Sequence, residues 1–297
     1  MYFVRFNTDS YPWFYRLSAD ENHSTLNRSG TAGINLSTIS AVWYRREAEP
    51  RLPSSLPSDQ NHAILKEIRC FLTGIYSSLE GVPWIDPIPK IDRAEHKLPQ
   101  LKVAREFGLV IPKTLMTNDP HQARRFLRKA KCPVIVKTLS PVSLAKDNEE
   151  AAVFTTMLSR RDTKALSGLR FCPMLFQHRI EKQCDIRVTI VGEDFFCVRI
   201  DSRNFDTDNT DWRRISDPAN YCSSFELPKT LRKRLLQMMT YYGLSYGAID
   251  LILTARGDFY FLELNPCGDW SWLSVDVQKK IAKSISALLQ KIAKRKA

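Results

Sequence analysis

An apolar hairpin that carries two acidic residues constrains this chain more than any other segment of its sequence. The apolar runs Ala248–Leu253 and Phe259–Leu264 flank a turn that contains Gly257, a pattern typical of a β-hairpin. If the connecting loop has two or four residues, Asp250 lies directly opposite Glu263. A three-residue loop would instead shift the register by one residue and separate the two carboxylates. We predict that they face each other.

Two facing carboxylates predict a metal site. Their Cβ atoms would lie about 5 Å apart, and the charges would repel each other by about 3 kcal/mol at an effective dielectric constant of about 20. Asn265 adds an amide oxygen on the same face. Asp250, Glu263 and Asn265 are therefore candidate ligands of Mg²⁺, which binds carboxylates together with phosphate oxygens and water. The alternatives are an acidic pair at a solvated sheet edge, or a carboxylate paired with an arginine.

A magnesium ion held in this way needs a phosphate, and the sequence offers candidate phosphate ligands. It contains no G-x-x-x-x-G-K-S/T P-loop, which excludes the commonest nucleotide-binding fold. Lys137 ends a short apolar strand, from which its ammonium group could reach a phosphate, although a surface lysine is the simpler interpretation. Asp185, Arg187 and Thr189 alternate with apolar residues along another predicted strand, so their side chains point to one face.

The remaining pattern predicts a mixed α/β or α+β fold, because short strand-like runs alternate with helical ones. A length of 297 residues suggests about two domains. The predicted strands outside the hairpin are Tyr2–Phe6, Ala41–Tyr44, Val134–Lys137, Met174–Gln177, Ile186–Val191 and Phe195–Ile200. Apolar stripes predict helices over residues 97–107, 120–130, 231–242 and 277–292. Gly108 and Gly243 end two of them, and Asp119 followed by proline begins a third.

Composition limits the class of protein. Arg5 and Asp9 interrupt the start of the chain where a signal peptide would be apolar, and no stretch approaches the roughly 18 apolar residues of a membrane span. The 7 cysteines are scattered without a C-x-x-C pair, so we expect reduced thiols in the cytoplasm rather than disulfides or a zinc site. The net charge of +12 favours a polyanionic partner: nucleic acid, a nucleotide or an acidic peptide.

Several ordered motifs resemble one enzyme family. The segments Gly247–Asp250 and Phe261–Pro266 resemble the magnesium hairpin of the ATP-grasp fold. Further segments resemble the ATP-grasp ligases that mature microviridin-type ribosomal peptides, the graspetide synthetases. These segments are Val42–Arg46, Trp84–Pro87, Arg93–Lys97, Gln100–Leu101, Ala104, Gly108–Asn118, Val191–Gly192, Ile200–Ser202 and Asp211–Arg214. The resemblance extends from residue 40 to residue 275.

The resemblance implies a three-part ATP-grasp architecture. We expect an N-terminal pre-ATP-grasp domain at residues 1–94, a central ATP-grasp subdomain at 95–178 and a C-terminal subdomain with the magnesium hairpin at 179–297. ATP would bind between the central and C-terminal parts. Carried over by position, the resemblance implies that Lys97 and Lys137 contact phosphates, Gln177 and His178 contact adenine, and Asp185 contacts ribose. It also implies that Asp250, Glu263 and Asn265 bind Mg²⁺. Arg187 and Arg213 would stabilise the transferred phosphoryl group.

The resemblance also implies a reaction and a partner. Asp or Glu side chains of a ribosomal precursor peptide would be activated by ATP and joined to hydroxyl or amino groups of the same peptide, as ω-esters or ω-amides. We expect a homodimer that binds no nucleic acid and no membrane. Two alternatives remain: a RimK-like carboxylate–amine ligase acting on a small molecule or a protein terminus, and a non-enzymatic nucleic-acid-binding module.

A precursor that receives several crosslinks must be held by a segment outside its reacting groups. The turn at Gly192 carries two acidic residues, Glu193 and Asp194, which could pair with a basic residue of a leader segment. A solvated turn is an equally good interpretation. Two positions depart from the family pattern, since the family often has Gln at Asp269 and Glu at His178.

Overall fold

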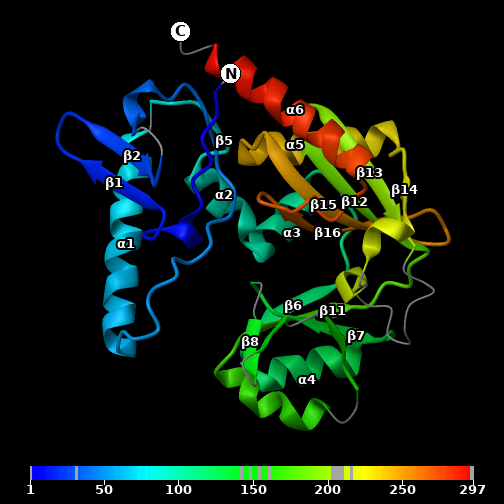
Figure 1. The fold of residues 1–297 in the computed structure, drawn as a ribbon. Helices are drawn as coiled ribbons and strands as arrows, with labels where there is room; N and C mark the ends of the chain where they lie inside the picture. Colours follow the sequence, from blue (N-terminus) through cyan, green and yellow to red (C-terminus); the bar gives the residue numbers. More distant parts are fainter. Residues whose placement is uncertain are drawn as a thin grey trace. The chain divides into compact units, whose positions relative to one another are not determined.

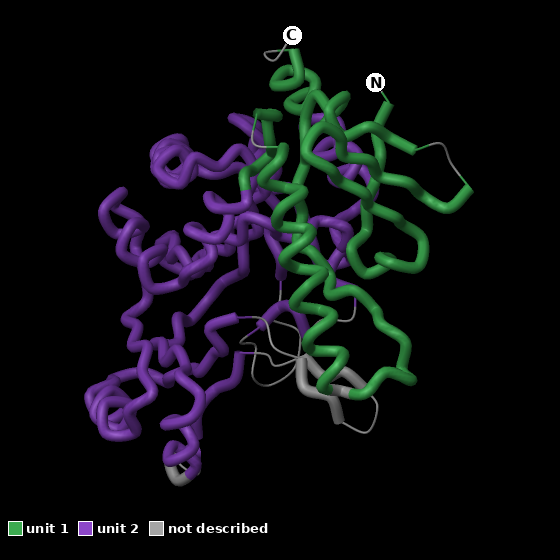
Figure 2. The backbone as a smooth tube through the Cα atoms, turned by 90° about the vertical axis from the view of Figure 1, so that its left-hand side faces the viewer, with its two compact units in different colours: residues 1–87, 286–297 green, residues 88–285 purple. Residues whose placement is uncertain are grey.

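The computed structural model describes residues 2–30, 33–79, 81–140, 143–146, 149–152, 155–159, 162–201, 211–214 and 217–294. Ser202, part of one motif above, lies outside these ranges. The chain divides into two compact units, residues 1–87 with 286–297 and residues 88–285 (Figure 2). Helices and strands mix in both units, which confirms the predicted fold class. None of the described helices is long and apolar enough to span a bilayer.

The first unit has a small antiparallel sheet and a long helix. Its strands are β1 (Tyr15–Ala19), β2 (Ser24–Arg28) and β3 (Ile34–Asn35), and a parallel pair joins β4 (Val42–Trp43) to β5 (Trp84–Ile85). Helix α1 (Ser58–Ser78) was not predicted. The core consists of Tyr15, Leu26, Leu36, Ile75, Leu79 and Val82.

The predicted strand Tyr2–Phe6 is wrong. This segment pairs with no strand of the described chain, and the side chains of Tyr2 and Phe3 are 87% and 81% exposed. Phe6 instead packs its ring edge-on against Tyr15, with ring centroids 5.0 Å apart. The aromatic residues that suggested a strand therefore have no neighbouring strand to pair with.

The second unit contains a four-stranded sheet with the order β10-β7-β11-β6, of which Figure 1 labels β7, β11 and β6. Its strands are β6 (Thr114–Thr117), β7 (Val134–Lys137), β10 (Thr156–Met157) and β11 (Met174–His178). Helix α4 (Pro120–Lys129) and the 3₁₀ segment η3 (Asp162–Arg170) pack on one face, around Ala123, Val134, Leu166, Leu169 and Phe176. Strands β8 (Ser143–Lys146) and β9 (Glu149–Ala152) form a separate hairpin.

A five-stranded antiparallel sheet with the order β14-β13-β12-β15-β16 forms the rest of this unit. Its strands are β12 (Cys184–Val191), β13 (Asp194–Ile200), β14 (Cys222–Ser224), β15 (Tyr246–Leu253) and β16 (Phe259–Asn265). Every residue of β12 and β15 is buried. Helix α5 (Lys229–Tyr242) runs across the sheet and buries Leu231, Leu235, Met238 and Met239 (Figure 1).

All four predicted helices form. They are α3 (Lys97–Glu106), α4, α5 and α6 (Val275–Ala293), and a short helix, α2 (Ile88–Glu95), precedes them. Asp119 caps α4 by accepting a hydrogen bond from the His121 N–H at 2.7 Å. Gly243 ends α5 in the left-handed conformation, with φ of 66°. Local capping signals therefore located these helices correctly.

The hairpin β15–β16 confirms that Asp250 faces Glu263, but by a different route from the one predicted. Thr254 N–H donates to the Asp258 carbonyl at 3.0 Å, so the loop has three residues, 255–257. Leu251 accordingly pairs with Phe261. A β-bulge then leaves Leu262 unpaired and restores the opposition of Asp250 and Glu263.

The outer edge of β16 is satisfied by a side chain rather than by another strand. Gln100 of α3, 1% exposed, donates from Nε2 to the Leu264 carbonyl at 2.7 Å and accepts from the Leu264 N–H at 2.8 Å. Farther along the same edge, the Phe261 N–H donates to the Val110 carbonyl at 2.8 Å. The primary amide of Gln100 thus pairs with one residue of β16 as a neighbouring backbone would.

The two-residue turn between β12 and β13 generates a stability prediction. Gly192 has φ of +59°, and a Cβ added there would meet no atom within 4 Å. Gly192→Ala should therefore lower the free energy of unfolding by about 1–2 kcal/mol through backbone strain alone. Urea unfolding followed by circular dichroism measures it. Gly168→Ala, whose added Cβ also meets nothing, is the matched control, and equal losses in both variants would contradict the argument.

Candidate active site

A buried ion pair joins the middle strands of the five-stranded sheet. Arg187 of β12 lies opposite Asp250 of β15, and its Nη1 donates to both carboxylate oxygens at 2.9 and 3.1 Å. The two residues are only 6% and 8% exposed. Nη2 of Arg187 also donates to the Asp269 carbonyl at 2.9 Å. Asp250 thus has an arginine partner, the alternative to a metal that the sequence analysis left open. Across the neighbouring strand β16, Asp250 faces Glu263.

Glu263 lies among cations on its other side. Lys97 Nζ is 3.3 Å from Glu263 Oε2, and Arg213 Nη1 is 4.0 Å from Oε1. Lys97 also donates to the Thr138 carbonyl at 3.3 Å, next to Lys137. The arrangement places two carboxylates between Arg187 on one side and three cations on the other.

The two facing carboxylates have opposite pKa shifts. Burial raises the pKa of Asp250 above its ordinary value, and Arg187 only partly offsets this. Burial would also raise the pKa of Glu263, but Lys97, Lys137 and Arg213 together hold it below its ordinary value. Burial in turn lowers the pKa of Lys137. Such a split is expected where two carboxylates share a site.

The donor set fits a hard cation. Asp250, Glu263 and Asn265 share one face of the β15–β16 pair, and Asn265 lies opposite Ala248. Asn265 Oδ1 already accepts a hydrogen bond from the Cys267 N–H at 3.0 Å, and a carbonyl oxygen can accept a second contact. The described ranges contain no group of three His, Cys, Asp or Glu side chains that could hold a metal ion by themselves. Two carboxylates and one amide are a sparse set, which suits Mg²⁺ that completes its shell with phosphate and water.

The adenine and ribose candidates are only partly brought together. Gln177 of β11 shares a sheet face with Lys137, since Leu175 pairs with Lys137 and side chains alternate along the strand. Gln177 is 2% exposed, donates to Thr114 Oγ1 at 2.9 Å, and its Oε1 has no hydrogen-bond partner within the described residues. Its buried oxygen is therefore available to a ligand on that face.

His178 and Asp185 differ from Gln177. The ring of His178 lies on the opposite sheet face, with its centroid 5.2 Å from that of Phe126 in α4, so its side chain does not share the face of Lys137. Any contact of His178 with a ligand on that face would have to use its backbone. Asp185 lies on the Arg187 face of β12 and accepts from Lys182 Nζ at 2.6 Å.

Sequence reasoning missed one residue near the site. Asp211 accepts hydrogen bonds from Arg213 Nε and Nη2, both at 2.8 Å, and its side chain is 4% exposed. Although burial opposes it, this pairing holds the pKa of Asp211 well below its ordinary value. The spacing Asp-x-Arg in the sequence was the available signal, but it did not show which arginine edge the carboxylate would take.

The turn with Glu193 and Asp194 lies at the tip of the β12–β13 hairpin, and both residues are exposed. Asp194 Oδ2 accepts a hydrogen bond from Ser284 Oγ of α6 at 2.6 Å. Val191, which pairs with Asp194, lies four residues beyond Arg187 along β12, and Arg187 belongs to the charged cluster formed by Lys97, Lys137, Arg187, Arg213, Asp250 and Glu263. The structure therefore separates this turn from the charged cluster.

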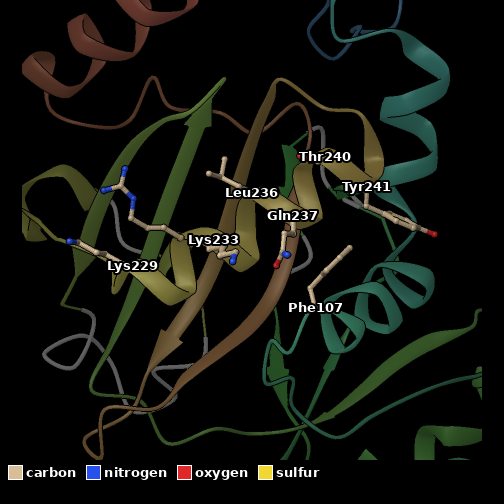
Figure 3. Close-up of a pocket in the computed structure, with 8 residues that line it drawn as sticks. Phe107, Lys229, Lys233, Leu236, Gln237, Thr240 and Tyr241 are labelled. Carbon is tan, nitrogen blue, oxygen red and sulfur yellow. The ribbon is translucent and has the colours of Figure 1, made fainter.

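A groove of about 640 Å³ lies on the outer side of α5, away from the charged cluster. Figure 3 shows Leu236, Gln237, Thr240 and Tyr241 projecting from α5, with Phe107 beside them. Lys229, Arg232 and Lys233 complete its lining. None of the candidate site residues lines this groove.

Two family models match the chain. The MvdD pre-ATP-grasp domain matches residues 1–92, and the RimK-like ATP-grasp domain matches residues 94–289. Among curated proteins, none matches this chain.

Solved structures are similar over nearly the whole chain. Macrocyclase MdnC from Microcystis aeruginosa MRC, bound with precursor peptide MdnA, is 35% identical, with a TM-score of 0.84 over 97% of this chain and 90% of that one. A RiPP-associated ATP-grasp ligase from Chryseobacterium gregarium, in complex with ADP and a leader and core peptide, is 33% identical, with a TM-score of 0.87 over 97% and 88%. Macrocyclase MdnB from Microcystis aeruginosa MRC is 30% identical, with a TM-score of 0.80 over 96% and 89%.

The loop after β16 generates a prediction about the buried ion pair. A Cβ at Gly268 would overlap the Ala248 side chain and lie 2.9 Å from Arg187 Nη2, while the Gly268 carbonyl accepts from Tyr246 Oη at 2.5 Å. Gly268→Ala should displace Arg187 or this loop and lower the free energy of unfolding by about 1–3 kcal/mol. Chemical denaturation measures the loss. Gly74→Ala, in α1 with open space around the new Cβ, should not destabilise, and a stable Gly268→Ala protein would refute the close packing.

Proposed function

We propose a function for this chain from the premise that it belongs to the RimK-like ATP-grasp family and carries a pre-ATP-grasp domain of the MvdD type. It is an ATP-grasp ligase. Its proposed reaction forms intramolecular ω-ester or ω-amide crosslinks in a ribosomal precursor peptide. The observation that carries this proposal is the similarity over 97% of the chain to two enzymes whose structures hold precursor, leader or core peptides.

The proposed reaction has two steps. A side-chain carboxylate of the peptide attacks the γ-phosphate of ATP, which gives an acyl phosphate and ADP. A hydroxyl or amino group of the same peptide then attacks the activated carbonyl carbon, loses its proton and expels phosphate. Such reactions depend mostly on positioning and on stabilising negative charge, so clustered cations and carboxylates suit them.

The charged cluster supports a role for each residue. Lys97 and Lys137 are proposed to bind phosphate oxygens, with Arg187 and Arg213 stabilising the charge that develops on the transferred phosphoryl group. Asp250, Glu263 and Asn265 are the residues that would hold Mg²⁺. The ion would neutralise phosphate charge and orient the γ-phosphate.

A second set of residues would hold the nucleoside. Gln177, whose buried Oε1 has no hydrogen-bond partner among the residues that the structure describes, is proposed to accept a hydrogen bond from the adenine amino group, and Asp185 to bind the ribose. His178 would contribute through its backbone, because its ring lies on the other face.

We also propose that the protein is a homodimer and that it acts in the cytoplasm. Light scattering of the purified protein would show the dimer. Its 7 cysteines form no disulfide in the structure, which suits a reducing compartment.

Mass spectrometry of the cognate precursor peptide, incubated with enzyme, ATP and Mg²⁺, tests the function. Each crosslink removes one water from the peptide, so we expect discrete losses of one or more waters and a matching release of ADP. A peptide that stays unmodified while ATP is consumed with a small amine would instead favour a ligase for small molecules.

Glu263→Gln tests the metal site in the same assay. The variant removes one of two proposed carboxylate ligands and keeps the side-chain shape, so we expect turnover to be lost while the protein stays folded. Glu226→Gln, at an exposed position, is the control for the change in charge and should crosslink normally. Normal activity of Glu263→Gln at limiting Mg²⁺ would reject Glu263 as a ligand.

The acidic turn at the β12–β13 tip is proposed to dock a basic residue of the leader. Exposed ion pairs contribute about 0–1 kcal/mol, so Glu193→Ala with Asp194→Ala should weaken leader binding several-fold and leave ATP affinity unchanged. Fluorescence anisotropy of a labelled leader peptide measures this. Glu226→Ala with Asp258→Ala changes the charge equally at two exposed positions and is the control. Unchanged leader binding at low salt, where charge effects are greatest, would exclude this turn.

A further inference from the structure

One edge of the Arg213 guanidinium group binds Asp211, while its remaining nitrogen faces Glu263. Its Nε and Nη2 donate to the two carboxylate oxygens of Asp211, both at 2.8 Å. Its remaining terminal nitrogen, Nη1, lies 4.0 Å from Glu263 Oε1. The side chain of Arg213 is 49% exposed, whereas that of Asp211 is 4% exposed. The buried carboxylate therefore fixes the direction of a partly exposed guanidinium group.

Asp211 is itself fixed from a second direction. Its Oδ2 accepts a hydrogen bond from the Thr155 N–H at 3.2 Å, and Arg214 Nη2 donates to the Thr155 carbonyl at 3.1 Å. Thr155 directly precedes β10, the edge strand of the four-stranded sheet. The segment that carries Arg213 is thus tied to one sheet while Arg213 faces a carboxylate of the other.

We propose that Asp211 is a positioning residue that prevents Arg213 from forming a bidentate ion pair with Glu263. An arginine edge matches a carboxylate in a planar pair of hydrogen bonds. Without Asp211, the free edge of Arg213 can take both oxygens of Glu263, which are needed by Mg²⁺. With Asp211 in place, Arg213 Nη1 stays 4.0 Å from Glu263 Oε1, and Lys97 Nζ lies 3.3 Å from Oε2. This inference rests on the proposed function and adds to it a residue outside the metal and phosphate contacts.

A double-mutant cycle tests the proposal. The variants are Asp211→Asn, Arg213→Gln and the two combined, with Asp217→Asn as the control for a nearby exposed carboxylate. Misplacement of a catalytic group by about 1 Å can cost about 10²-fold in rate, so we expect a loss of that size in Asp211→Asn, together with a higher Mg²⁺ requirement. If Asp211 acts through Arg213, the combined variant is no slower than Arg213→Gln.

Three results would overturn the proposal. Asp211→Asn could match the wild type in rate and Mg²⁺ requirement, or its loss could multiply with that of Arg213→Gln, which would mean that the two residues act separately. Asp211→Glu, which keeps the carboxylate, should recover part of the rate, and a folded Asp211→Glu no better than Asp211→Asn is the third. If Asp211→Asn does not fold, the Asp211→Glu and Arg213→Gln pair completes the same cycle.

Two readouts do not depend on peptide crosslinking. In calorimetry, Mg²⁺ should strengthen ADP binding less in Asp211→Asn than in the wild type, because Glu263 would be less available to the ion. Near-ultraviolet circular dichroism responds to the packing of aromatic side chains. Trp212, between Asp211 and Arg213, packs against Trp272 with ring centroids 4.5 Å apart and ring planes tilted by 40°, so we expect the spectrum to change in Asp211→Asn and not in Asp217→Asn. If the wild type crosslinks no peptide, the proposed function fails, and these two measurements still decide the role of Asp211.

Discussion

The opposition of Asp250 and Glu263 is the constraint on which the rest of the site depends. Two facing carboxylates in a buried hairpin would destabilise it unless opposite charges flank them. Arg187 flanks the pair from β12, at 2.9 Å from Asp250, and Lys97 flanks it from α3, at 3.3 Å from Glu263. The four side chains form a row with cations at both ends. The flanking cations offset the repulsion between the two acids, which are the proposed ligands of Mg²⁺.

This alignment requires a fixed register of β16 against β15 and a fixed position of β16 against α3. The bulge at Leu262 sets the register against β15, because it restores the pairing that a three-residue loop would shift by one residue. The side-chain amide of Gln100 sets the position against α3 by pairing with both backbone groups of Leu264. Two local devices therefore align residues that lie far apart in the chain. The acids, the flanking lysine and the backbone supports are parts of one structure.

The sequence predicted the fold class and the opposition of Asp250 and Glu263, whereas the metal and phosphate roles of the site residues stay predictions. The alternation of apolar residues located β12, β15 and β16, and the capping signals at Asp119 and Gly243 located their helices. The bulge at Leu262 has no signal in neighbouring residues. The same holds for Asp211, whose partner Thr155 lies in a separate segment. Helix α1 was missed because three prolines before Ser58 indicated only a loop, and Tyr2–Phe6 had strand-forming residues without a partner strand.

The side-chain amide of Gln100 has a mechanical consequence. Because Gln100 joins α3 to Leu264 of β16, the separation of Lys97 and Glu263 would be preserved if the two sheets of the second unit hinged apart, and the contact that would break is the one from Lys97 to the Thr138 carbonyl. Lys137 would move with the four-stranded sheet, and so would the anchor of Asp211 at Thr155. Under the proposed roles, opening would withdraw Lys137 from the phosphate groups, while Asp250, Glu263 and Lys97 would stay together.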